Sequence, residues 1–100
     1  MTSERLPDGM SGPAADRAAA PRAMYFVSAD ADPAMAARLI EPFAKMGLTP
    51  TRVHISREDG TGDVMAADLR VEGVDATTAH LVDKMLRRVV GVRSVIAVME

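Results

Sequence analysis

The sequence predicts an α+β domain whose elements follow the order strand, helix, strand, strand, helix, strand. Two segments repeat apolar residues at helical spacing, and four shorter segments are apolar or alternate between apolar and polar residues. Glycine, proline or aspartate stands at nearly every junction between them. All six segments lie between residues 24 and 99 of a chain of 100 residues, a length that allows one domain.

Residues 1–23 lack the material of a hydrophobic core, because Ala, Pro, Gly, Ser and isolated charges fill most of the segment. Such a composition does not bury enough apolar surface to offset chain entropy, so we expect a disordered tail followed by a domain over residues 24–100. The tail has neither the apolar run of a secretory signal nor the Arg-rich, acid-poor character of a transit peptide. We therefore expect a cytoplasmic protein.

The first strand is expected over residues 24–29, where both faces are apolar, as in a central strand. Asp32 is expected to cap the first helix, with Pro33 at its first position. Gly47 ends this helix. Its apolar stripe consists of Met35, Leu39, Ile40, Phe43 and Met46. Pro42 lies inside the helix and removes one backbone hydrogen bond, which predicts a kink or a division there.

The second strand is expected over residues 51–56, half-exposed because apolar and polar residues alternate along it. Pro50 cannot donate to a ladder, which favours a position at the edge of the sheet. Residues 58–62 contain an Asp-Gly pair and predict a hairpin connection. The third strand follows over residues 64–72 with one core face and one solvated face.

Asp75 is expected to cap the second helix, and Gly91 to end it. The apolar stripe of this helix consists of Leu81, Val82, Met85, Leu86 and Val89. The last strand, over residues 92–99, is apolar on both faces. The resulting βαββαβ order is the ferredoxin-like pattern, which hosts many unrelated functions, so function must be argued from particular residues.

Composition excludes several classes of function. The chain has no cysteine, and therefore no disulfide and no thiolate metal site, and we expect neither a metal nor a cofactor. The net charge of −2 and a third strand without aromatic residues argue against nucleic-acid binding. No stretch approaches the ~18 apolar residues of a membrane span. Neither a glycine-rich phosphate loop nor a known catalytic motif is present, and we expect no enzyme.

The residues that could serve in catalysis or phosphate binding have simpler structural interpretations. His54 is interpreted as a solvated strand residue, and His80 as a surface helix residue that pairs with its charged neighbours. A group of cations stands near the end of the second helix, where the helix dipole explains them better than a phosphate site: Lys84, Arg87 and Arg88.

Self-association is the expected use of the sheet face that points away from the helices. Val64, Ala66 and one side of the last strand are apolar there. Scattered exposed apolar residues are normal, but a domain this small buries only ~60% of its unfolded surface and is marginal alone. We therefore expect a homodimer.

The run from Arg38 to Leu48, continued by residues 49–55, resembles the first helix and second strand of ACT domains. The likeness is closest to the regulatory small subunit of acetolactate synthase, in which an Arg, two apolar residues and a Phe precede a helix-ending glycine and a strand. Residues 81–98 are similar to the second helix and fourth strand of the same family. The resemblance covers residues 24–99.

The resemblance implies a four-stranded antiparallel sheet with two helices on one face, which dimerises through its strands. It also implies a non-catalytic regulatory module that binds an amino acid and acts on a large catalytic subunit, here acetolactate synthase in branched-chain amino-acid biosynthesis. An interaction module of the same fold that binds no ligand stays open as the alternative.

In such domains the loop between the first strand and the first helix faces the second strand of a partner. The ligand-binding residues implied by the resemblance are Asp30, Ala31, Asp32, Ala34, Met35, Val53 and His54. Backbone N–H groups at the helix start would hold the carboxylate of the amino acid, and Asp30 is placed to receive its α-amino group. Ala34 and Ala31 stand where the family usually has a glycine and an Asn or Asp.

Overall fold

The computed structural model describes residues 21–58, 60 and 62–100. The element order confirms the expected one: β1 (Arg22–Asp30), α2 (Met35–Lys45), β2 (Arg52–Arg57), β3 (Val64–Glu72), α3 (Ala76–Arg87) and β4 (Val92–Met99). The expected disordered tail lies outside the described residues, apart from positions 21–23. In the part of the chain that the structure describes, neither helix is long and apolar enough to cross a membrane.

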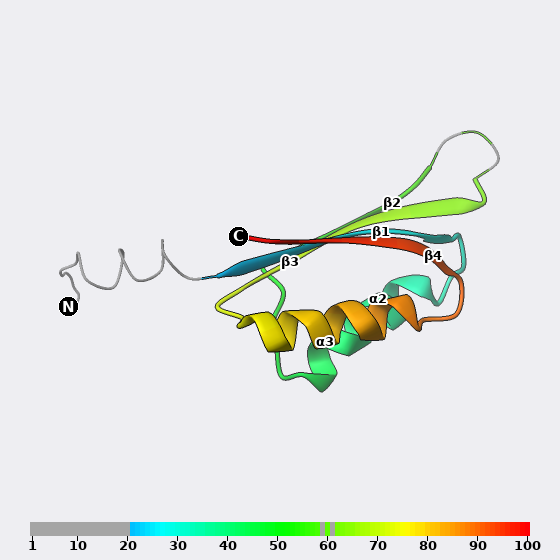
Figure 1. Cartoon of the computed structure of the whole chain (residues 1–100). Coiled ribbons are helices and arrows are strands. Elements are labelled where there is room, and N and C mark those ends of the chain that lie inside the picture. The colour runs from blue at the N-terminus through cyan, green and yellow to red at the C-terminus, as the bar shows by residue number, and fades with distance from the viewer. Residues whose placement is uncertain (1–20, 59, 61) are drawn as a thin grey trace, which may run out of the picture.

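The four strands form one antiparallel sheet in the order β2-β3-β1-β4. Both helices lie on the same face of this sheet, and the other face is left open (Figure 1). The apolar β1 occupies a central position, and β2 lies at an edge, as Pro50 predicts. The α+β, ferredoxin-like fold expected from the sequence is therefore confirmed.

β1 begins two residues earlier than the sequence predicts. Ala23 is 1% exposed and pairs with Val71 on one side and Met99 on the other. Just before the strand, the carbonyl of Pro21 accepts a hydrogen bond of 2.8 Å from the amide of Gly73. Assigning residues 21–23 to the tail was therefore wrong. Alanine and proline give little hydrophobic signal in the sequence, but the backbone of Pro21 and Ala23 bonds or pairs with neighbouring segments.

The first helix differs from expectation at its start and in its middle. Its N-cap is Ala34, with no side-chain cap, so assigning the cap to Asp32 was wrong. The helix also continues through Pro42 as one element instead of dividing. Pro42 and Phe43 are both buried, and packing against the core compensates for the single backbone bond that a proline removes.

The core fills the space between the helices and the sheet. Its large fully buried side chains are Tyr25, Met35, Leu39, Phe43, Leu69, Val71, Val82 and Leu86. The rings of Tyr25 and Phe43 meet edge to face, with their centroids 5.8 Å apart. Leu81 was expected in the core stripe, but it is 42% exposed, and Ala79 is the buried residue of that turn.

Candidate functional site

The loop between β1 and α2 is held by its two acidic side chains. Asp30 Oδ1 accepts a hydrogen bond of 2.7 Å from Arg93 Nε of β4. Asp32 Oδ1 accepts from the amide of Ala34 at 2.8 Å, and the Asp32 carbonyl accepts from the amide of Met35 at 2.9 Å. Because Arg93 neutralises Asp30, the loop presents less negative charge than its sequence suggests.

Most backbone donors of this loop are occupied. The amide of Ala31 donates to the carbonyl of Asp63 at 2.8 Å, and Pro33 has no N–H. The next two amides, of Ala34 and Met35, are held by Asp32. Among the described residues, no carbonyl accepts from the amides of Ala36 and Ala37. The donors available to a carboxylate therefore lie one to two residues further into the helix than expected.

Met35 is a packing residue of this loop rather than an exposed ligand contact. Its side chain is 1% exposed. It packs against Gly91, whose φ is +97°, and a Cβ built there would lie only 2.7 Å from Met35 Cε and 3.5 Å from Asp30 Oδ2. Glycine at position 91 thus allows the loop to approach the turn that leads into β4.

The other two expected ligand residues lie far along the sheet from this loop. Val53 on β2 is level with Leu69 on β3, which is level with Tyr25 on β1. Asp30 pairs instead with Val64, the first residue of β3 and five positions before Leu69. Within one chain the structure keeps the loop and this part of β2 apart.

The alternation of a strand also separates Val53 from His54. His54 lies on the open face of the sheet, in the row that contains Phe26, whereas Val53 points to the helix side and is 47% exposed. Only one of the two side chains can therefore face a given ligand.

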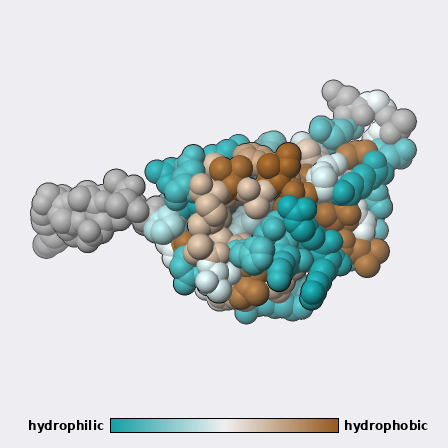
Figure 2. Space-filling model, in the orientation of Figure 1, coloured by the Kyte–Doolittle hydropathy of each residue, from teal (hydrophilic) through white to brown (hydrophobic). Residues whose placement is uncertain are grey.

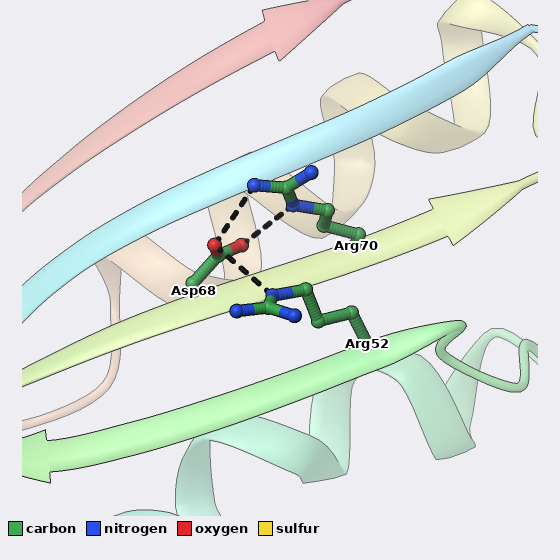
Figure 3. A network of polar contacts seen from close by, with 3 residues as sticks. All are labelled: Arg52, Asp68 and Arg70. Atoms are coloured by element: carbon green, nitrogen blue, oxygen red, sulfur yellow. Dashed lines mark hydrogen bonds and ion pairs between the residues drawn. The ribbon is translucent and has the colours of Figure 1, made fainter.

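A triad of charged residues lies on the open face (Figure 3). Arg70 donates to both oxygens of Asp68 at 2.9 Å, and Arg52 Nε lies 3.3 Å from Asp68 Oδ2. The hydrogen bonds from Arg70 lower the pKa of Asp68 below its ordinary value, and Arg52 adds to this effect. Arg70 also lies over the ring of Phe26, 6.0 Å from its centroid.

The cross-strand register arranges the open face in rows. One row consists of small residues from all four strands: Ser56, Ala66, Ser28 and Ser94. The next row consists of His54, Asp68, Phe26 and Ile96. The two rows line a hollow of about 280 Å³. Phe26 and Ile96 are 37% and 63% exposed, so an apolar ridge stands beside a groove of small side chains.

The described residues hold no cluster of three or more His, Asp or Glu that could bind a metal. His54 and His80 are both exposed, as expected. The sequence predicts that His80 pairs with its charged neighbours. In the structure one of those neighbours, Asp83, instead accepts a hydrogen bond of 3.0 Å from Arg87 Nε. Arg87 also donates to the carbonyl of Val95 at 2.7 Å, which ties α3 to β4.

Arg93 is the residue of this site that sequence reasoning missed. The only signal was its position two residues after the helix-ending Gly91, which places it near the start of the last strand. Its partner, Asp30, lies 63 positions earlier in the chain. Local patterns do not reveal a contact over that separation.

Comparison with known proteins extends this description. A family model described as an ACT-like domain matches residues 16–99. The fold is similar to that of the ACT domain from the GTP pyrophosphokinase of Chlorobium tepidum, with a TM-score of 0.65 at 13% identity over 79% of this chain and 99% of that one. It is also similar to the C-terminal domain of the MgtC protein from Mycobacterium tuberculosis, with a TM-score of 0.63 at 12% identity over 81% and 88% of the two chains.

The regulatory subunit of aspartate kinase from Thermus thermophilus is a third similar structure, with a TM-score of 0.55 at 12% identity over 81% of this chain and 50% of that one. No curated protein matches the sequence. At identities of 12–13%, these similarities support a shared fold and nothing more. Because the family model spans most of the chain, from the segment before β1 to the end of β4, the protein belongs to the family of ACT-like domains.

Proposed function

We propose that this chain is a non-catalytic regulatory module that pairs with a second copy and binds an amino acid between the two copies. The observation that carries the proposal is the separation, within one chain, of the β1–α2 loop from the middle of β2. Each part offers only half of a binding site. A second copy that presents its β2 to the loop completes the site.

The loop offers complementary chemistry for the two ends of an amino acid. The amides of Ala36 and Ala37, in the first turn of α2, can donate to an α-carboxylate, and the helix dipole favours a negative charge there. The carboxylate of Asp30 can accept from an α-amino group. Its partner Arg93 holds the Asp30 carboxylate beside the loop through a hydrogen bond of 2.7 Å.

The open sheet face provides a surface for the second copy. Phe26 and Ile96 form its apolar ridge, and the row of small residues beside them can receive the ridge of another copy. Such a face is self-complementary, as a two-fold interface requires. Burying it would also add to the small core of a single chain.

The branched-chain amino acids are the first ligands to test, because the first helix and second strand resemble the regulatory small subunit of acetolactate synthase. Isothermal titration calorimetry with valine, leucine and isoleucine should give saturable heat for at least one of them. D-valine serves as the control, because its α-amino group cannot reach Asp30 in the same pose. Co-purification of a large catalytic subunit with the tagged protein would support the enzyme assignment.

A module that only pairs with other proteins is the second candidate. It is favoured by the loss of donors at the helix start, where Pro33 has no N–H and Asp32 occupies the next two amides. This candidate predicts no heat with any amino acid, while light scattering still detects the dimer.

A further inference from the structure

The outer surface of the helix layer carries a groove that the proposed amino-acid site does not use. It lies along the seam between α2 and α3 and encloses about 630 Å³. The residues that line it are Arg38, Glu41, Pro42, Lys45, Met85, Arg88, Val89 and Val90. The lining positions on α2 span eight residues, from Arg38 to Lys45, or about 10 Å along the helix axis. The groove therefore runs along about two turns of α2.

The floor of the groove is apolar although it lies on the outside of the protein. Pro42 is buried, Met85 and Val89 are half-buried, and Val90 is 83% exposed. No other large apolar side chain among the described residues is as exposed as Val90. Figure 2 shows brown, apolar residues beside teal, hydrophilic ones at the end of the molecule where α3 passes into β4.

The rim of the groove is positively charged. The lining residues include three cations, Arg38, Lys45 and Arg88, and one carboxylate, Glu41. Their net charge is +2, whereas the net charge of the whole chain is −2. The Nζ of Lys45 lies 3.9 Å from Glu41, and Nη1 of Arg38 lies 3.8 Å from Asp32, so both pairs are loose and solvent-exposed. The side chain of Arg88 has no ion-pair partner among the described residues.

Pro42 leaves one backbone acceptor of α2 without its usual helical donor. Because a proline has no N–H, the carbonyl of Arg38 receives no bond from the residue four positions later.

We propose that the seam between α2 and α3 is a docking site for an acidic amphipathic helix of another protein. The apolar residues of that helix would lie on Val89, Val90 and Pro42, and its carboxylates would pair with Arg38, Lys45 and Arg88. An apolar seam between two helices suits a third helix whose anchors recur at every third or fourth position. The cations stand on both sides of the seam, which suits a segment with charge on both flanks rather than a small anion.

Two synthetic peptides test the charge preference. The first is a fluorescein-labelled helical peptide with leucine at every third or fourth position and glutamate on the flanking positions, and the second has lysine in place of each glutamate. Fluorescence anisotropy at low salt should show the acidic peptide binding more tightly, by on the order of tenfold, and losing affinity as salt is added.

Charge-reversal variants locate the site. Arg88→Glu should weaken binding of the acidic peptide by about tenfold and strengthen binding of the lysine peptide. The second effect is a gain that misfolding cannot produce. Arg22→Glu, on the sheet side of the molecule, makes the same charge change away from the groove and should alter either affinity by less than about twofold. Val90→Ser should weaken both peptides.

Several outcomes would overturn the proposal. These are equal affinity for the two peptides, no binding of the acidic peptide at about millimolar concentration, or an equal loss in Arg22→Glu and Arg88→Glu. Arg88-dependent binding to phosphatidylglycerol vesicles, without binding of the acidic peptide, would assign the groove to an anionic membrane surface instead. None of these results depends on whether the protein binds an amino acid.

Discussion

The hydroxyl of Tyr25 donates a hydrogen bond of 2.7 Å to the carbonyl oxygen of Ala79 and so joins the central strand β1 to α3. Tyr25 is 1% exposed, and it is the only tyrosine of the chain. Burial, assisted by the negative charge of Asp83, raises its pKa from 10.0 to about 12. The polar tip of one core side chain therefore holds the two layers together.

This pKa predicts a loss of stability in alkali. Between pH 10 and 12 the folded protein keeps the proton of Tyr25, whereas the unfolded chain releases it. The free energy of unfolding should therefore fall as pH rises through this window, by about 1.4 kcal/mol per pH unit from this group. Urea unfolding at a series of pH values measures the slope, and the ultraviolet absorbance of tyrosinate reports Tyr25 directly.

Tyr25→Phe is the control for this window. It should remove the contribution of Tyr25 to the slope and leave the rest of the alkaline slope unchanged. At neutral pH it should cost about 1 kcal/mol, the usual net worth of one hydrogen bond. An unchanged alkaline slope in the variant would mean that Tyr25 titrates normally in the folded protein.

Asp68 should stabilise the protein above acid pH. Because its pKa is lowered in the folded state from the ordinary 3.8, its contribution is present above that value and is lost as pH falls through the lower folded pKa. Asp68→Asn should lower stability at neutral pH by about 1 kcal/mol, a modest value because the side chains of Arg52 and Arg70 are 52% and 41% exposed. Glu58→Gln, an exposed carboxylate near the end of β2, should have little effect. Equal acid unfolding curves for wild type and Asp68→Asn would contradict this.

Variants of the β1–α2 loop should change amino-acid affinity in opposite directions. Ala34→Gly removes a methyl group at the helix start and should strengthen binding, because the carboxylate can approach the backbone more closely. Asp30→Ala should weaken it, on the order of tenfold for a lost charged contact. Glu72→Ala, a carboxylate at the other end of the sheet, is the calorimetric control. Equal affinity in all four proteins would place the ligand elsewhere.

The open face should hold the dimer together. Ile96→Asp puts a charge on the apolar ridge and should shift the protein toward monomer in light scattering at micromolar concentration. Leu81→Asp makes the same substitution at an exposed position of α3 and should leave the dimer intact. A folded monomer already in the wild type would exclude self-association.

Two N-terminal deletions should distinguish the contribution of the tail to stability from that of β1. Removing residues 1–20, which lack core material, should leave the melting temperature within a few degrees. Removing residues 1–23 should lower it further, because this cut deletes Ala23, which pairs with both neighbouring strands. If the shorter deletion already caused a large loss, the segment would have to contribute to the fold.

Regular periodicity explains why the element order could be predicted from the sequence. The errors occurred where packing overrides local preference. Pro42 stays helical because its turn is buried, and Ala23 joins a strand because two neighbouring strands pair with it. Elements were recognisable because their signals are local.

The candidate site was less predictable, because its contacts join distant parts of the chain. The β1–α2 loop could be named from the resemblance, but the pairing of Asp30 with Arg93 links two ends of the domain. The pairing of Asp68 with Arg52 likewise depends on the register of β2 against β3. Such contacts follow from the assembled sheet, not from any one segment.

The turn at Gly91 gives the two proposed binding surfaces a common piece of backbone. Val90 lines the seam between the helices, and the carbonyl of Gly91 accepts from the amide of Asp30 at 2.8 Å. With Met35 packed against Gly91, this backbone has little room to move independently of the loop. If binding at either proposed surface shifts this turn, a helix docked on Val90 and an amino acid held by Asp30 will change each other's affinity. By thermodynamic linkage, the factor by which the helix changes the affinity for the amino acid equals the factor by which the amino acid changes the affinity for the helix.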